Sequence, residues 1–359
     1  MGLLLHSSQS AVVSRVKLRF ARGLEVPFCD RDVALRQFRE IAERGTRRPV
    51  VIYGPEGCGK TALLRQVALL LEEEGYRVVY VNPLENYFKN AVYCSKDVEN
   101  LVIEAFRDLL SIYAGDLGRA LAYLGLAAAS VILRRFHKPM LAVLIDDVFQ
   151  VIRDSAGISV ASYVKSALNL IEYPPGDYEK IVVIIATSED ISREEIGRHR
   201  WAEMCAMWNF SREGFYELYS KVPGKKPSFD IVWRWTGGNP WLFAELYEHD
   251  WNVDIILDSL VQVKKLEIFI RQLDNENREI LREAVQDIDY LWNNLNKCIS
   301  LVKELVKLNL IVDALPSRKQ YLWIDVPPPE KDPELGIGKH FAWQTPLHRE
   351  AVKKILETL

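Results

Sequence analysis

Metal-binding and disulfide-forming patterns are largely missing from this sequence. Its five cysteines, an odd number, are scattered and never spaced as C-x-x-C, which argues against a disulfide framework and against a zinc site. The six histidines form no pair at metal-ligand spacing. We therefore expect reduced thiols in a cytosolic protein.

Targeting signals and membrane-spanning runs are also missing. Residues 1–6 contain neither a basic region nor a long apolar core, and His6 stands where a lipidation signal requires Ser or Thr. The longest apolar run, Ala120 to Leu133, has 14 residues and is too short to cross a bilayer. We expect a buried helix there, a cytoplasmic location and no membrane partner.

Composition and charge place the chain among ordinary globular proteins. The 359 residues are enough for two or three domains, and 49% of them are hydrophobic while 26% are charged. The net charge of -3 gives no general attraction to nucleic acids. A nucleic-acid site would therefore need a local basic patch.

A glycine-rich loop follows the β-branched stretch Val50 to Tyr53 and matches the P-loop, or Walker A, pattern. In this pattern the backbone N–H groups and the N-terminus of the next helix bind phosphate. Lys60 would reach the β- and γ-phosphates, and the Thr61 hydroxyl would bind Mg²⁺. The predicted nucleotide-binding residues of the loop are Gly54, Pro55, Glu56, Gly57, Cys58, Gly59, Lys60, Thr61 and Ala62.

Two carboxylates end a second apolar strand, Leu141 to Ile145, as a Walker B motif does. We expect Asp146 to hold Mg²⁺ together with Thr61, and Asp147 to polarise the water that attacks the γ-phosphate. A strand ending in two aspartates can also be a solvated turn. The P-loop at a domain-sized distance favours the nucleotide site.

Hydroxyls and arginines beyond the next strand have two interpretations each. Thr187 ends the stretch Ile181 to Ala186, where it, or Ser188 after it, would contact the γ-phosphate or the attacking water; the alternative is a simple strand-end cap. An arginine at 193, 198 or 200 would face a phosphate across an interface, or lie on a solvated helix face.

Apolar strands that alternate with helices predict an α/β fold with a parallel sheet covered by helices on both faces. The Pro223 to Pro227 segment reads as a linker to a helical lid. The predicted division is an N-terminal arm, 1–26, with a strand or extended segment from Val12; a P-loop domain, 27–222; a helical domain, 223–285; and a C-terminal domain, 286–359.

The C-terminal domain has the pattern of a winged helix. A helix near residues 291–308 precedes a predicted β-hairpin of two strands, residues 310–313 and 321–325, with residues 341–343 as a returning strand. The charges from residue 277 onward, 12 Lys and Arg against 12 Asp and Glu, provide no basic footprint.

Residues just before the P-loop strand offer a further candidate contact. Phe28 and Arg31 would close over a nucleotide base, or Asp30 would simply cap the following helix.

Several motifs together resemble the archaeal ATPase family, which belongs to the STAND class of P-loop ATPases, within the AAA+-like, ASCE-type group. They are residues 28–32, the P-loop, residues 144–150 and Thr236-Gly237-Gly238-Asn239-Pro240. The resemblance implies that Pro240 lies against adenine and that Phe28 and Arg31 help to form the base pocket. It also implies that the Thr187 strand lies between the P-loop strand and the Asp146 strand.

The resemblance implies ATP or ADP and Mg²⁺ as ligands. Relatives commonly carry Asp-Glu where this chain has Asp146-Asp147, and no residue resembles a sensor-2 arginine, so we expect slow hydrolysis by a nucleotide-controlled switch with an unknown protein partner. One alternative is a DNA-binding ATPase, like initiators or transposition helpers, whose winged helix binds duplex DNA. A second is a scaffold that retains ADP without turnover.

Overall fold

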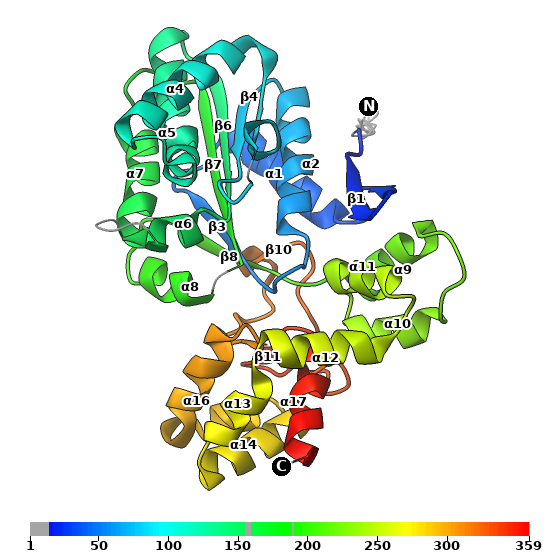
Figure 1. The fold of residues 1–359 in the computed structure, drawn as a ribbon. Helices are drawn as coiled ribbons and strands as arrows, with labels where there is room; N and C mark the ends of the chain where they lie inside the picture. Colours follow the sequence, from blue (N-terminus) through cyan, green and yellow to red (C-terminus); the bar gives the residue numbers. More distant parts are fainter. Residues whose placement is uncertain (1–13, 86, 155–158, 189, 359) are drawn as a thin grey trace, which may run out of the picture.

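The computed structural model describes residues 14–358 except 86, 155–158 and 189. Within these residues the central sheet has the strand order β10-β8-β3-β7-β6-β4-β5 (Figure 1). Its strands are β3 (Val50–Tyr53), β4 (Arg77–Val81), β5 (Val92–Cys94), β6 (Met140–Asp146), β7 (Lys180–Thr187), β8 (Glu203–Met207) and β10 (Trp323–Ile324). All neighbours pair in parallel except β5, which is antiparallel to β4. The order confirms that the Thr187 strand separates the P-loop strand from the Asp146 strand.

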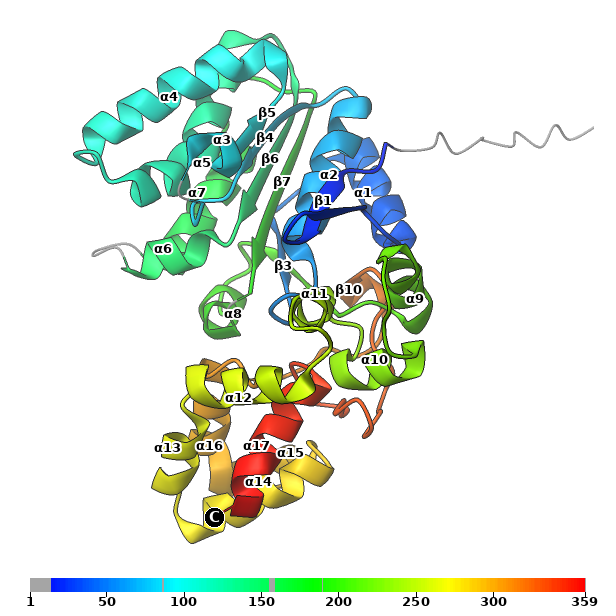
Figure 2. The same cartoon turned by 45° about the vertical axis from the view of Figure 1, so that its right-hand side comes forward.

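Helices cover both faces of the sheet (Figure 2). The helices α1 (Asp32–Arg44) and α2 (Lys60–Glu73) lie on one face, and α4 (Glu99–Ile112), α5 (Leu117–Arg135), α6 (Val148–Asp154) and α7 (Val160–Glu172) on the other. Val50 and Ile52 pack into the core under α1 and α2, whereas Val51 packs into the opposite core. Alternate side chains of one strand are thus buried on opposite faces, which explains the continuous apolar strands and confirms the α/β prediction.

Helix α5 contains the long apolar run. It is the single helix among the described residues that is long and apolar enough, by length and composition, to span a membrane. Half of its most apolar 18-residue stretch is nevertheless buried inside the protein. Leu121, Leu124 and Ile132 belong to the core beside the sheet, as expected for a buried helix.

The N-terminal segment forms a hairpin of β1 (Lys17–Ala21) and β2 (Leu24–Pro27). Residues 1–13 of the predicted arm, including the start of the strand expected from Val12, lie outside the described residues. The Phe20 ring packs edge-on against Phe243, so the hairpin contacts the helical part of the chain.

Helical segments after the sheet form two clusters. The helices α9 (Arg212–Lys221), α10 (Phe229–Thr236) and α11 (Pro240–Glu248) share an aromatic core. A second core joins α11 to α12 (Val253–Val263), α13 (Leu266–Gln272), α14 (Asn275–Gln286), α15 (Tyr290–Asn293), α16 (Leu295–Lys307) and α17 (Pro346–Thr358). Short elements complete the chain: α3 (Phe88–Ala91), α8 (Asp190–Gly197), η1 (Lys96–Val98) and η2 (Gln320–Leu322). The domain boundaries at 27, 223 and 286 stay predictions.

The predicted pairing of residues 310–313 with residues 321–325 is wrong. β9 (Ile311–Val312) pairs antiparallel with β11 (Ala342–Trp343), whereas β10 joins the central sheet beside β8. The physical reason is that β8 offers an edge with unpaired backbone groups. In the pairing with this edge, Trp323 of β10 is 1% exposed. The winged helix itself stays a prediction.

Candidate nucleotide site

The predicted P-loop lies between β3 and α2, at the carboxyl end of the sheet. A Cβ on Gly54 would lie 1.9 Å from the Met207 carbonyl oxygen, and a Cβ on Gly57 would lie 2.5 Å from the Trp241 Cβ. Gly57 also has a φ of +74°. The glycines are therefore required by close approach and by backbone conformation.

Lys60 begins α2, and its side chain reaches back to the loop. Its Nζ donates hydrogen bonds to the carbonyls of Gly54, at 2.9 Å, and Pro55, at 2.8 Å. The residue is 5% exposed. The loop thus combines a buried cation with a helix N-terminus, the combination that binds phosphate.

Asp146 is completely buried at the end of β6. Its Oδ2 accepts hydrogen bonds from the Tyr80 hydroxyl, at 3.0 Å, and the Asn82 amide, at 3.4 Å, while its Oδ1 has no hydrogen-bond partner among the described residues. Burial, and then the charge of Asp147, raise the pKa of Asp146, whereas Thr61, Tyr80 and Lys60 lower it.

The donor set at Asp146 fits Mg²⁺. The buried carboxylate oxygen without a hydrogen-bond partner and the Thr61 hydroxyl would supply the hard oxygen ligands that Mg²⁺ prefers. Among the described residues no group of three His, Cys, Asp or Glu side chains is placed to hold a metal ion. A P-loop site does not require one, because nucleotide phosphates and water complete the coordination.

Asp147 adopts a left-handed conformation with a φ of +47°. Its Oδ1 accepts hydrogen bonds from the Ser188 backbone N–H and hydroxyl, both at 3.1 Å. Ser188 lines the cavity described below, whereas Thr187 is 1% exposed within β7. The hydroxyl at the cavity wall is therefore that of Ser188.

A cavity of about 480 Å³ opens beside the P-loop. The predicted site residues that line it are Phe28, Arg31, Glu56, Gly57, Gly59, Lys60, Thr61, Ala62, Asp147 and Pro240. The remaining ones, Gly54, Pro55, Cys58, Asp146 and Thr187, are buried outside this lining. Residues from four distant parts of the chain thus meet at one cavity.

Other lining residues escaped sequence reasoning. Leu18, Arg19 and Phe20 come from the β1–β2 hairpin, which carries no recognisable motif. Arg65 lies four residues after Thr61, and this helical spacing could have placed it on the same face of α2. It adds a second cation from α2 to the cavity wall.

The Gly-Asn-Pro turn lies directly on the P-loop. The Asn239 side-chain amide donates a hydrogen bond to the Glu56 carbonyl at 2.8 Å, and the Trp241 N–H donates one to the Gly57 carbonyl at 3.3 Å. The Asn239 Oδ1 also caps α11 by accepting from the Leu242 N–H at 3.0 Å. The first turn of α11 is therefore part of the site.

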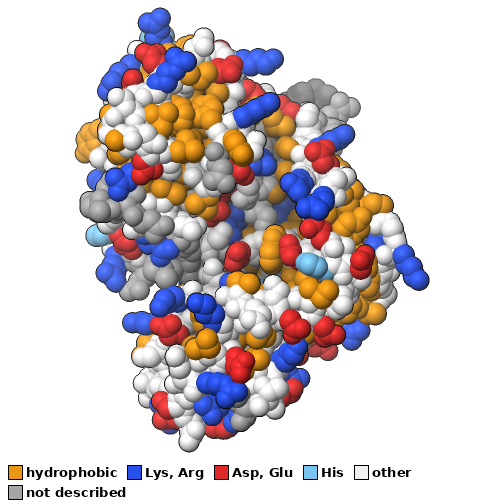
Figure 3. All heavy atoms as spheres, in the orientation of Figure 1, with side chains coloured by type: hydrophobic (Ala, Val, Ile, Leu, Met, Phe, Trp, Pro, Cys, Tyr) orange, Lys and Arg blue, Asp and Glu red, His pale blue; other side chains and the backbone are white. Residues whose placement is uncertain are grey.

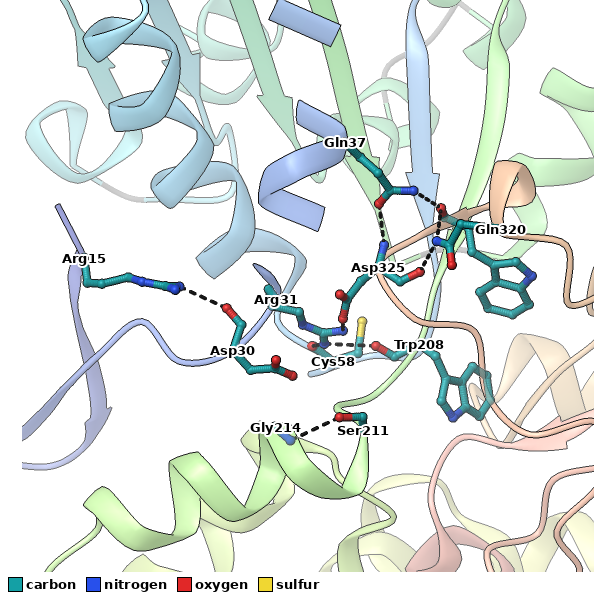
Figure 4. Close-up of polar contacts among 11 residues, drawn as sticks. Arg15, Asp30, Arg31, Gln37, Cys58, Trp208, Ser211, Gly214, Gln320 and Asp325 are labelled. Carbon is teal, nitrogen blue, oxygen red and sulfur yellow. Dashed lines mark hydrogen bonds and ion pairs between the residues drawn. The ribbon is translucent and has the colours of Figure 1, made fainter. Parts of the chain in front are cut away.

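Arg31 points away from solvent and is 1% exposed. Its guanidinium contacts the Asp325 carboxylate and the carbonyls of Cys58 and Trp208 (Figure 4). The alternative in which Asp30 caps α1 is wrong, because the N-cap position belongs to Arg31 and has no side-chain cap. The backbone at Arg31 is left-handed, with a φ of +62°. Helix α1 therefore begins at Asp32, one residue later than a cap by Asp30 would place it.

Arg193 is one of the three arginines considered for a phosphate contact. It forms an ion pair with Asp313 and lies over the Tyr53 ring, 4.8 Å from its centroid. Arg198 and Arg200 are exposed. A contact between any of them and a phosphate across an interface stays a prediction.

A family model described as an ATPase domain predominantly from Archaea matches residues 28–246, well over half of the chain. The chain belongs to this archaeal ATPase family. The match confirms the resemblance predicted from the sequence motifs. The family model ends at residue 246, yet the sheet of this archaeal ATPase also includes β10, which starts at Trp323.

Two solved structures illustrate the distant similarity of this archaeal ATPase to other proteins. DnaA from Aquifex aeolicus bound to AMPPCP is 13% identical, with a TM-score of 0.36, and the match covers 73% of this chain and 71% of DnaA. Orc1 from Aeropyrum pernix in complex with DNA is 14% identical, with a TM-score of 0.39 and coverage of 92% and 93%. No curated protein matches the sequence.

Proposed function

We propose that this archaeal ATPase is a cytosolic, Mg²⁺-dependent ATPase with slow turnover, and that it acts as a nucleotide-controlled conformational switch of the STAND class. The observation that carries the proposal is the Gly-Asn-Pro turn on the P-loop: Asn239 bonds to Glu56, while Pro240 lines the same cavity as Lys60. A nucleotide in this cavity would contact the sheet domain and the helical part at once. Its phosphate state would therefore bias their relative arrangement.

Six residues of the site have a specific role in this proposal. Phe28 and Pro240 enclose the adenine, and Lys60 neutralises phosphate charge. Thr61 and Asp146 would hold Mg²⁺, which when bound would neutralise charge on the phosphates. Asp147 orients the attacking water.

The position of Asp147 supports slow turnover. One of its carboxylate oxygens already accepts two hydrogen bonds from Ser188, which leaves the other oxygen for water. The side chain is also one methylene shorter than the glutamate common in relatives. Both features limit how far the carboxylate can reach toward the water.

Duplex DNA remains the alternative partner, with the C-terminal unit as its reader, and an unknown protein is the partner of the switch. The helix α16 followed by the β9–β11 pair supports the alternative, because a winged helix has this arrangement. The C-terminal unit lies in the lower part of Figure 3, and the face shown there carries acidic and basic side chains mixed together. This mixture favours the switch. A DNA reader would present a predominantly basic surface there.

The test is the steady-state ATP hydrolysis rate of the purified chain with and without duplex DNA. Lys60→Ala is the blank, and Lys89→Ala, which changes an exposed lysine of α3, is the matched control. We expect slow turnover that is indifferent to DNA, is lost in Lys60→Ala and is retained in Lys89→Ala. Strong stimulation by DNA would establish the alternative, and retained ADP without turnover would establish a scaffold.

A further inference from the structure

Three consecutive carbonyls of the P-loop accept hydrogen bonds from groups outside the loop. The acceptors belong to Glu56, Gly57 and Cys58. Their respective donors are the Asn239 side chain at 2.8 Å, the Trp241 N–H at 3.3 Å and the Arg31 guanidinium at 2.8 Å. The outer face of the loop is therefore held by Arg31, 27 positions from Cys58, and by the turn at Asn239, 183 positions from Glu56.

The orientation of these carbonyls fixes the orientation of the N–H groups that bind phosphate. In a trans peptide the C=O and the following N–H point in opposite directions, and the described chain contains no cis peptide bond. A donor that holds the Cys58 carbonyl outward therefore turns the Gly59 N–H inward. Inward N–H groups form the anion-binding concavity of a P-loop.

Arg31 is the one charged donor of the three, and it is itself held by the C-terminal part of the chain. Its Nη1 donates to the Asp325 Oδ2 at 2.7 Å, while Nη2 donates to Cys58 and to the Trp208 carbonyl at 3.0 Å. Its guanidinium lies 4.4 Å from the centroid of the Phe210 ring. The guanidinium thus has little freedom to move away from the P-loop.

Asp325 follows β10 and is fixed from both sides (Figure 4). Its N–H donates to the Gln37 Oε1 of α1 at 2.8 Å, and its carbonyl accepts from the Gln320 side chain at 2.7 Å. The Asp325 and Arg31 side chains are 3% and 1% exposed. A buried ion pair of this kind tolerates the loss of one partner poorly, because the remaining charge is left uncompensated.

We propose that Asp325 is a positioning residue of the nucleotide site, which acts through Arg31 to set the P-loop peptide between Cys58 and Gly59 for phosphate binding. The proposal rests on the proposed function, because it needs a nucleotide phosphate in the P-loop. It makes the C-terminal part of the chain, outside the 28–246 family match, a component of the nucleotide site.

Coupling follows directly from this arrangement. If docking of β10 tightens phosphate binding, then bound phosphate must stabilise the docking of β10 by the same free energy. Gln344 provides a second contact from the C-terminal part, since its Oε1 accepts a hydrogen bond from the Glu56 N–H at 2.9 Å. The P-loop therefore contacts the C-terminal part directly at Glu56, and at Cys58 it is linked to that part through Arg31 and Asp325.

The experiment measures the Kd for ADP with Mg²⁺ by calorimetry on the full chain. The variants are Asp325→Asn, Arg31→Lys and the double variant; Asp325→Asn keeps the side-chain shape but removes the charge. We expect each single variant to weaken ADP binding at least about tenfold, which corresponds to 1.4 kcal/mol. Because both single variants act through one contact, the Kd of the double variant should lie within about twofold of the Kd of the single variant that binds ADP less tightly.

Two further variants keep the proposal open to disproof. Asp287→Asn is the matched control, since Asp287 forms an exposed ion pair with Lys331 in the same part of the chain, and it should bind ADP like the wild type. If Asp325→Asn does not fold, Gln37→Ala removes the backbone anchor of Asp325 and should also weaken ADP binding.

The outcomes separate the two proposals. A wild-type chain that binds no ADP would overturn the proposed function. A wild type that binds ADP, together with a folded Asp325→Asn that binds it equally well, would overturn the positioning role alone. Additive losses in the double variant would also overturn it, because independent sites add.

Discussion

The side-chain amide of Asn239 donates a 2.8 Å hydrogen bond to the carbonyl of Glu56, which lies 183 residues earlier in the chain. The same side chain caps α11 through its oxygen. Asn239→Asp would keep the cap but lose the donor, and it would bring a carboxylate toward the Glu56 and Asn209 oxygens. We expect the free energy of unfolding to fall by about 1–3 kcal/mol.

The matched control for this prediction is Asn252→Asp. Asn252 caps α12 through a bond from the Asp254 N–H, so the same substitution should change stability by less than about 0.5 kcal/mol. Denaturant unfolding of both variants provides the comparison. Equal losses would show that the bond to Glu56 contributes nothing beyond the cap.

The edge strand β10 should contribute strongly to stability. Trp323 is 1% exposed at the junction between the sheet and the C-terminal part, so Trp323→Ala should cost about 3–5 kcal/mol of the free energy of unfolding. Tyr321→Ala, two residues earlier at a position that is 72% exposed, should cost less than about 0.5 kcal/mol. Thermal and denaturant unfolding measure both, and a small effect of Trp323→Ala would contradict the packing of β10 on the sheet.

Asp147 should affect the chemical step rather than binding. Asp147→Asn removes the carboxylate proposed to orient water, so kcat for ATP hydrolysis should fall by a factor of about 10² or more, while the Kd for ATP changes little. Ser188→Ala removes one of the two bonds to Asp147 and should give a smaller loss of kcat. Steady-state kinetics and calorimetry separate the two quantities, and a large rise in Kd with unchanged kcat would reject this role.

Magnesium should strengthen ATP binding through Asp146. In the wild type, EDTA should weaken ATP binding, because the buried Asp146 Oδ1 and Thr61 lose the cation proposed to bind them. In Asp146→Asn this dependence should largely disappear. The exposed Asp258→Asn is the control, and calorimetry with Mg²⁺ or EDTA is the measurement. An equal EDTA effect in all three chains would place the metal ligands elsewhere.

His348 should make stability depend on pH. Burial, and then the charge of Lys264, lower the pKa of His348 in the folded chain to about 3. Its Nδ1 lies 2.8 Å from the Thr345 hydroxyl oxygen. Between the unfolded pKa, about 6.5, and the folded value, the unfolded state binds a proton that the folded state does not. Stability should therefore fall as the pH drops below 6.5.

The size of this effect follows from proton linkage. Between pH 7 and pH 5 the wild type should lose about 2 kcal/mol more than His348→Gln, which cannot titrate in this range. Denaturant unfolding at the two pH values is the measurement. Equal losses in the two chains would show that His348 is not buried in its neutral form.

The candidate site was predictable where local pattern determines structure. The P-loop glycines, Lys60 and the acidic end of β6 are required by short-range chemistry, and the alternation of strands and helices fixed their place at one edge of a parallel sheet. The Thr236 to Pro240 motif identified the turn that lies on the P-loop. These features need only a few neighbouring residues to be recognised.

Other features depend on packing between distant segments. Nothing local distinguishes Trp323 and Ile324 from a strand of a C-terminal hairpin, because a short apolar run suits either pairing. The open edge of β8 decided the outcome. The Ser188 hydroxyl likewise replaced that of Thr187 at the cavity because of where β7 ends and how Asp147 turns.

The sequence by itself thus determined a P-loop ATPase domain and most of the residues predicted to bind phosphate, since these rest on spacing along one strand, loop and helix. Only the tertiary structure decided that the β1–β2 hairpin lines the cavity and that Asp325 holds Arg31 on the P-loop. Such contacts join residues that are up to 294 positions apart. They depend on the complementary shapes and charges of folded units, which no local pattern encodes.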